Sequence, residues 1–174
     1  MSGLIQLVNL VLSTVAFALV ARWYVLPRLR GMSFDRAVQP FLLLHSFRHI
    51  GMMFLASGAT KATLADGFAI YAAYGDLATS LIAFLALGAV RLRWALALPM
   101  VWFFNVVGSL DLIVAVSRGV WHDAASGMGA TFWIPSVIVP ALLVTHALVF
   151  LLLVRGARAQ SAANTTVRPV ASGS

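Results

Sequence analysis

Residues 131–154 read TFWIPSVIVPALLVTHALVFLLLV, a run without Lys, Arg, Asp or Glu, and Arg155 follows it directly. A helix of about 20 apolar residues is long enough to cross the hydrocarbon core of a bilayer, which is about 30 Å thick. The run therefore predicts a transmembrane helix that ends at a cationic residue.

The rest of the chain extends this prediction to an all-α integral membrane protein. The 174 residues are 61% hydrophobic and 10% charged, whereas soluble domains are usually about 45–50% apolar. The sequence predicts one domain, residues 1–155, that forms a bundle of about five transmembrane helices, at 3–26, 39–57, 67–90, 94–117 and 131–154. Residues 156–174 are rich in Ala, Ser and Thr and are predicted to form a disordered cytoplasmic tail.

Cationic residues are distributed unevenly between the predicted connections. Lys61 and Arg118 lie in the second and fourth connections. Nine arginines lie in or near the first connection, the third connection and the tail: Arg22, Arg28, Arg30, Arg36, Arg91, Arg93, Arg155, Arg158 and Arg168. Because cytoplasmic loops of membrane proteins carry the excess of Lys and Arg, this distribution predicts an N-terminus outside and a C-terminus in the cytoplasm. The expected location is the plasma membrane, as a multi-pass protein of a bacterial inner membrane.

The net charge of +7 does not indicate a nucleic-acid partner, because the arginines lie at helix ends and form no continuous basic face. The expected partner is the lipid bilayer, including anionic lipid. Five helices are few for an alternating-access transporter, so a homo-oligomer or a larger membrane complex is also expected. The chain has no Cys, which excludes disulfides, thiolate metal sites and cysteine nucleophiles.

Ionisable residues inside the predicted helices are the candidates for function, since each costs about 2.5–3.5 kcal/mol on insertion scales. At 100° per residue, His45, Arg48 and His49 share one face of the helix predicted at 39–57. Asp76 lies on a face of small residues in the next helix, and small faces allow close helix packing. Asn105 and Asp111 share one face of the fourth helix.

The predicted helices place several of these groups at similar depths. With alternating directions and a rise of about 1.5 Å per residue, Arg48, His49, Asp76 and Asn105 lie near the bilayer midplane. We expect Arg48 to pair with Asp76, with Asp111 as the reserve partner, because neither charge is tolerable alone in hydrocarbon. His146 has apolar neighbours on its helix, and a single hydrogen bond is expected to satisfy it.

The first functional interpretation is a buried site that binds a small polar or anionic ligand or relays protons. Its predicted residues are His45, Arg48, His49, Asp76, Asn105 and Asp111. Histidine changes charge near neutral pH, which suits proton coupling. Such a protein would be transporter-like, a sensor or an accessory subunit. No nucleophile has the surroundings of a known catalytic motif, so the sequence favours a role other than an enzyme.

Two alternatives stay open at this stage. His45 and His49, four residues apart, could bind a divalent metal together with Asp76, or one of them could bind haem together with His146. Arg48 on the same face opposes a dication, and Glu is absent from the chain. The other alternative is a structural membrane subunit, in which the polar cluster only fixes how the helices pack.

Overall fold

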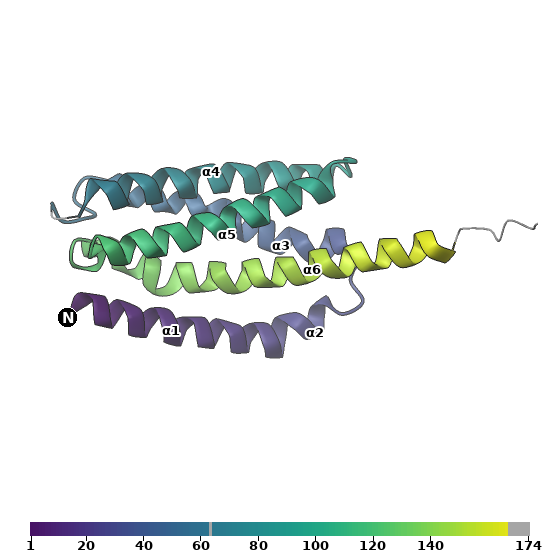
Figure 1. Cartoon of the computed structure of the whole chain (residues 1–174), viewed down its shortest axis with the longest axis horizontal. Coiled ribbons are helices and arrows are strands. Elements are labelled where there is room, and N and C mark those ends of the chain that lie inside the picture. Colours follow the sequence, from purple (N-terminus) through teal and green to yellow (C-terminus); the bar gives the residue numbers. More distant parts are fainter. Residues whose placement is uncertain (63, 167–174) are drawn as a thin grey trace, which may run out of the picture.

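The computed structural model describes residues 1–62 and 64–166, with side chains as far as Gly156. Within these residues it contains helices and no strands (Figure 1). The long elements are α1 Ser2–Val20, α3 Phe34–Ser46, α4 Asp66–Arg91, α5 Ala97–Trp121 and α6 Val139–Thr166. The short elements are the π-helical turn Ala21–Val25 and α2 Leu26–Leu29 after α1, the 3-10 helix Phe47–Leu55 after α3, and the turns Ala124–Ser126, Gly129–Phe132 and Ile134–Ile138 before α6.

Four helices in the described part of the chain are long and apolar enough to cross a membrane: Ser2–Leu29, Asp66–Arg91, Ala97–Trp121 and Gly129–Gly156. They correspond to four of the five predicted helices. The helix predicted at 39–57 differs, because α3 begins at Phe34 and changes to a 3-10 helix at Phe47. Pro40 lies inside α3 and not at its start. Proline has no backbone N–H, so the carbonyl four residues earlier in the helix lacks its usual hydrogen bond. Pro40 is exposed, so this carbonyl lies on the outer side of α3.

In the 3-10 segment Phe47–Leu55, the residues that face inward differ from those that would face inward in an α-helix. Arg48, Gly51 and Phe54 are its buried residues, because side chains three residues apart eclipse one another in a 3-10 helix. The change of helix type coincides with a contact from another helix: Ser80 of α4 donates a hydrogen bond to the Ser46 carbonyl, with an oxygen to oxygen distance of 2.5 Å.

α6 continues to Thr166, so it extends into the segment that is predicted to form a disordered tail, and the disorder of that segment stays a prediction. Residues 167–174, the rest of that predicted tail, lie outside the described residues.

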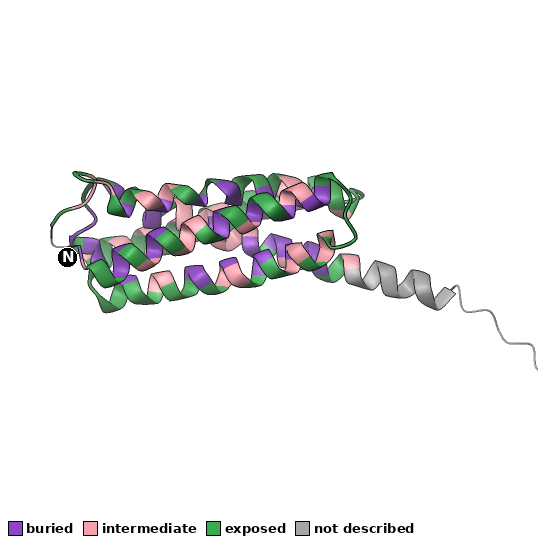
Figure 2. Ribbon diagram, turned by 90° about the horizontal axis from the view of Figure 1, so that it is seen from above, coloured by how far each residue is buried: buried purple, intermediate pink, exposed green. Residues whose placement is uncertain are grey.

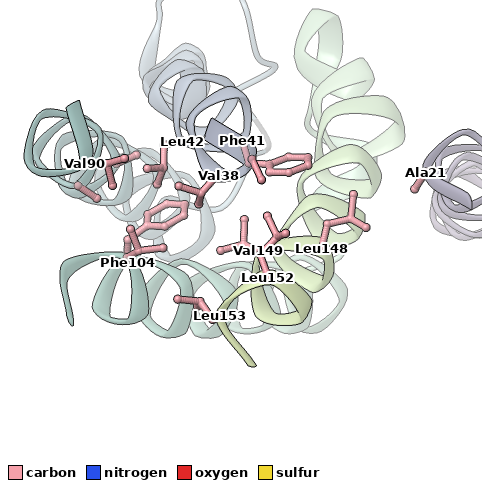
Figure 3. Close-up of a cluster of buried hydrophobic side chains, with 14 residues drawn as sticks. Ala21, Val38, Phe41, Leu42, Val90, Phe104, Leu148, Val149, Leu152 and Leu153 are labelled. Atoms are coloured by element: carbon pink, nitrogen blue, oxygen red, sulfur yellow. The ribbon is translucent and has the colours of Figure 1, made fainter. Parts of the chain in front are cut away.

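Two apolar clusters lie at opposite ends of the bundle. One joins α3 and the start of α5 to the last turns of α4 and the middle of α6, and Figure 3 shows Val38, Leu42 and Phe104 gathered within it. The other surrounds Phe54, Phe68 and Met128 near the opposite ends of the same helices. The candidate site lies between the two clusters.

The outside of the bundle is apolar. α1 contains no buried residue, and it lies at the edge of the bundle against α6 (Figure 1). Exposed residues cover much of the other helices as well (Figure 2), and many of them are large and hydrophobic. Contiguous apolar surface of this extent is typical of proteins that face lipid or a partner.

Candidate functional site: a buried arginine between two carboxylates

Arg48 is the centre of the site. Its side chain is fully buried, and its guanidinium contacts three groups on two other helices. Nε donates to Asp76 Oδ1 of α4 at 2.7 Å, and Nη2 lies 2.6 Å from the same oxygen. Nη2 also donates to Asp111 Oδ2 of α5 at 2.6 Å, and Nη1 donates to the Gly108 carbonyl at 3.0 Å. One cation therefore joins the 3-10 segment to α4 and α5.

The predicted pair of Arg48 and Asp76 is confirmed. Asp111 is not a reserve partner, however, since it binds Arg48 at the same time. Arg48, Asp76 and Asp111 are called the Arg48 cluster below. The cluster contains one cation and two carboxylates, so it carries a net charge of −1 when both carboxylates are ionised.

Two glycines make room for the carboxylate oxygens that do not bind Arg48. A Cβ atom on Gly51 would overlap Asp76 Oδ2, and a Cβ atom on Gly75 would overlap Asp111 Oδ1. Any larger residue would therefore push a carboxylate away from the guanidinium. The side chains of Asp76 and Asp111 are 16% and 10% exposed, against 0% for Arg48. The carboxylates are thus the part of the cluster that other molecules can reach.

A small cavity of about 40 Å³ lies beside Asp76, between α1, α4 and α5. A single water needs roughly 10–15 Å³ by a comparable measure, so the cavity can hold water. Gln6 of α1 and Asp76 supply polar side chains in a wall that is otherwise apolar. Sequence analysis missed Gln6, although an amide side chain in an apolar helix is a signal that could have indicated it.

A second polar group, called the histidine pair below, consists of His45 of α3 and His146 of α6. Their ring centroids are 4.1 Å apart, and the residues are 0% and 3% exposed. His45 Nε2 lies 3.0 Å from Thr145 Oγ1, and His146 Nδ1 lies 2.7 Å from Asn105 Oδ1. The expected single hydrogen bond of His146 is present at Nδ1, but His146 Nε2 has no partner and the ring also contacts His45. This contact was not predicted, because α3 and α6 are far apart along the chain and periodicity within each helix does not show which helices are neighbours.

The structure places the remaining predicted residues differently. His49 is exposed on the outside of the bundle, and its Nδ1 lies 2.9 Å from the Ser46 carbonyl. It joins neither the Arg48 cluster nor the histidine pair. The prediction that His49 shares an inward face with His45 and Arg48 assumed 100° per residue, whereas the 3-10 segment turns about 120° per residue.

The predicted metal set of His45, His49 and Asp76 is not brought together. Within residues 1–62 and 64–166, no group of three or more His, Asp or Glu side chains is placed to hold a metal ion. The rings of His45 and His146 are in contact, with centroids 4.1 Å apart and planes tilted by 46°, so no porphyrin fits between them. The geometry therefore does not support the metal and haem interpretations in the described residues.

The chain matches one family model, described as Domain of unknown function (DUF8737), over residues 5–154. This span is most of the chain, so the chain belongs to that family, and it includes both the Arg48 cluster and the histidine pair. No curated protein matches the chain, and no solved structure matches it.

Proposed function

We propose that this member of the DUF8737 family spans a membrane with its N-terminus outside, and that its Arg48 cluster binds and relays a proton. Four apolar helices support the first part. α3 and the 3-10 segment together provide a fifth span: with rises of about 1.5 and 2.0 Å per residue, Phe34–Leu55 covers roughly 37 Å. This length exceeds a hydrocarbon core of about 30 Å.

The charges at the two ends of the bundle support the orientation. The connections after α2 and α4 lie at the end of the bundle from which α6 projects (Figure 1), and most of the arginines are near this end. We propose that it faces the cytoplasm, in agreement with the excess of Lys and Arg in cytoplasmic loops. A reporter fused after Arg158 should be cytoplasmic, and one inserted near Ala124 should be external. The opposite labelling would overturn this orientation.

The observation that carries the proton proposal is the excess of carboxylates around Arg48. A net charge of −1 in a largely buried site is costly, because an unbalanced charge loses its hydration. A carboxyl group avoids this cost by taking up one proton. An anionic ligand would raise the negative charge further, and it would have to displace Asp76 or Asp111 from Arg48. We therefore favour a proton over the anion as the ligand of this site.

Infrared spectroscopy of the protein in liposomes tests this proposal, because the C=O stretch of a protonated carboxyl group is separate from the bands of a carboxylate. We expect one protonated carboxyl group in the wild type at neutral pH. Asp76→Asn and Asp111→Asn should each abolish the band, since Arg48 then balances the one carboxylate that remains. Asp66→Asn, at an exposed position at the start of α4, should leave the band unchanged.

The structural role predicted as an alternative has one observation in its favour, which is that Arg48 joins three segments of the bundle. The same spectra distinguish the two roles. Absence of the band from the wild type, or its persistence in both Asp76→Asn and Asp111→Asn, would contradict proton binding. The structural role, in which the cluster only fixes how the helices pack, would then be favoured.

A further inference from the structure

The histidine pair contains two buried ring nitrogens that lack a hydrogen-bond partner. These atoms are His45 Nδ1 and His146 Nε2. Among the described residues, every other buried side-chain nitrogen or oxygen atom has a hydrogen-bond partner. A buried polar group without a partner costs about 1–3 kcal/mol. Two such atoms in rings that touch each other require an explanation, such as a bound ion, water or proton.

The hydrogen bonds assign the proton positions on His146. Asn105 Nδ2 donates to the backbone carbonyl of His146 at 3.2 Å, which fixes the orientation of the Asn105 amide. Asn105 Oδ1 therefore faces His146 Nδ1 as an acceptor, so Nδ1 carries the proton. His146 Nε2 is left with an unprotonated lone pair.

The same reasoning applies to His45. The hydroxyl of Thr145 donates its single proton to the carbonyls of Ala141 and Leu142, at 2.8 and 3.0 Å. Thr145 Oγ1 must then accept from His45 Nε2, which carries the proton, and Nδ1 has the lone pair. The pair is therefore neutral in this structure, and it presents two lone pairs and no donor at its free nitrogens.

The histidine pair lies next to the Arg48 cluster. His45 precedes Arg48 by three residues along the chain. The His146 ring packs against Gly108, the residue whose carbonyl accepts from Arg48: a Cβ atom on Gly108 would lie 2.9 Å from His146 Nε2. On its other side the pair contacts Phe104, with ring centroids 5.1 Å from His45 and 5.4 Å from His146. Phe104 belongs to the apolar cluster of Figure 3, so the pair lies between the Arg48 cluster and the arginine-rich end.

We propose that the histidine pair is the second binding site of the proton held by the Arg48 cluster, on the side toward the arginine-rich end of the bundle. This inference rests on the proposed function. The proton leaves a carboxyl oxygen of Asp76 or Asp111 and binds the lone pair of His45 Nδ1 or His146 Nε2. Both carboxylates are then ionised, and an imidazolium and Arg48 balance them. The interior as a whole stays neutral in both states, so the transfer creates no unbalanced buried charge.

The charged groups that surround the pair are those of the Arg48 cluster. Arg48 of the 3-10 segment opposes a proton on the pair, whereas Asp76 of α4 and Asp111 of α5 favour it. Asn105 and Thr145 are uncharged, and His49 is exposed and outside the site. Because the two carboxylates outnumber the one guanidinium, a positive charge on the pair is electrostatically favoured only while both carboxylates are present.

Solid-state NMR of the protein in liposomes, labelled with ¹⁵N-histidine, tests the inference. Spectra of His49→Gln and His122→Gln assign the signals of those two exposed residues. At neutral pH we expect the Nε2–H tautomer at His45 and the Nδ1–H tautomer at His146. On acidification the pair should take up one proton and not two, because two imidazolium rings in contact repel each other.

Asp111→Asn is the decisive variant, with Asp76→Asn as its duplicate. In either variant, charging of the pair should require on the order of tenfold more protons, since Arg48 balances the one remaining carboxylate, the interior holds no carboxyl proton to transfer, and a proton taken up by the pair would add an unbalanced charge. Asp66→Asn should behave as the wild type. Identical titration of the pair in all four proteins, or a pair that stays neutral throughout a titration to pH 4, would overturn the inference. Infrared spectra of the same samples report the carboxyl proton separately, so failure of the histidine site and failure of the carboxyl site are distinguishable.

Discussion

Replacement of Arg48 by Met should destabilise the protein far more than replacement of either carboxylate that it binds. Arg48→Met keeps an unbranched side chain of similar length but removes four contacts, and it leaves Asp76 and Asp111 without a cation. Loss of one partner of a buried ion pair typically costs about 3–5 kcal/mol, and here two carboxylates lose the same partner. We therefore expect a loss at or above about 5 kcal/mol of unfolding free energy.

The carboxylates should differ from each other. Asp76 Oδ1 receives two contacts from Arg48, whereas Asp111 receives one. Hydrogen bonds to charged groups contribute about 1.5–3 kcal/mol each. Asp76→Asn should therefore cost about 1.5–3 kcal/mol. Asp111→Asn should cost about 1 kcal/mol or less, because it keeps an acceptor near Arg48 and removes the excess negative charge.

The effect of Asp111→Asn on stability should change sign when Arg48 is absent. In the wild type Asp111→Asn is neutral or mildly destabilising, but in the Arg48→Met background it should stabilise the protein, because it removes an unbalanced carboxylate. The assay is reversible unfolding in mixed micelles of dodecyl maltoside and dodecyl sulfate, followed by tryptophan fluorescence at neutral pH. Arg36→Met, at an exposed position of α3, is the matched control and should change stability by less than about 0.5 kcal/mol. Additive effects of Arg48→Met and Asp111→Asn would refute the shared ion pair.

Two further predictions concern the packing around the site. Gly51→Ala and Gly75→Ala should each destabilise the protein and shift the infrared band of the carboxyl group, because the added methyl group overlaps Asp76 or Asp111. Gly88→Ala is the control: nothing lies within 4 Å of the added methyl group, so this change should stabilise α4 by up to about 1 kcal/mol. A loss of stability in Gly88→Ala equal to that in Gly51→Ala would show that the overlaps are unimportant. His49→Ala should change the unfolding free energy by less than about 0.5 kcal/mol, since the side chain is exposed. His45→Ala should cost about 2 kcal/mol or more, because it leaves a cavity inside the bundle. Equal effects of the two changes in the same unfolding assay would contradict the orientation of the 3-10 segment.

Physical rules that act along the chain were sufficient to predict part of the site. A buried arginine needs a carboxylate, and helix rise places Arg48 and Asp76 at similar depth, so the pair could be predicted without a structure. The apolar runs likewise predicted four helices that the structure contains. These conclusions depend on composition, on helical periodicity and on the cost of a lone charge, all of which can be read from the order of residues.

Contacts between distant segments decided the rest. Ser80 of α4 binds the Ser46 carbonyl where α3 changes to a 3-10 helix, and this change turns His49 outward while Arg48 stays inside. Asp111 could be placed on an inward face by periodicity, but only the packing of α5 against α4 and the 3-10 segment brings it to Arg48 together with Asp76. The contact between the rings of His45 and His146 depends on where α6 returns beside α3. Sequence order alone determines which residues need a partner inside the bundle, and the tertiary structure determines which partner each one receives, because helix type and packing set the direction of every side chain.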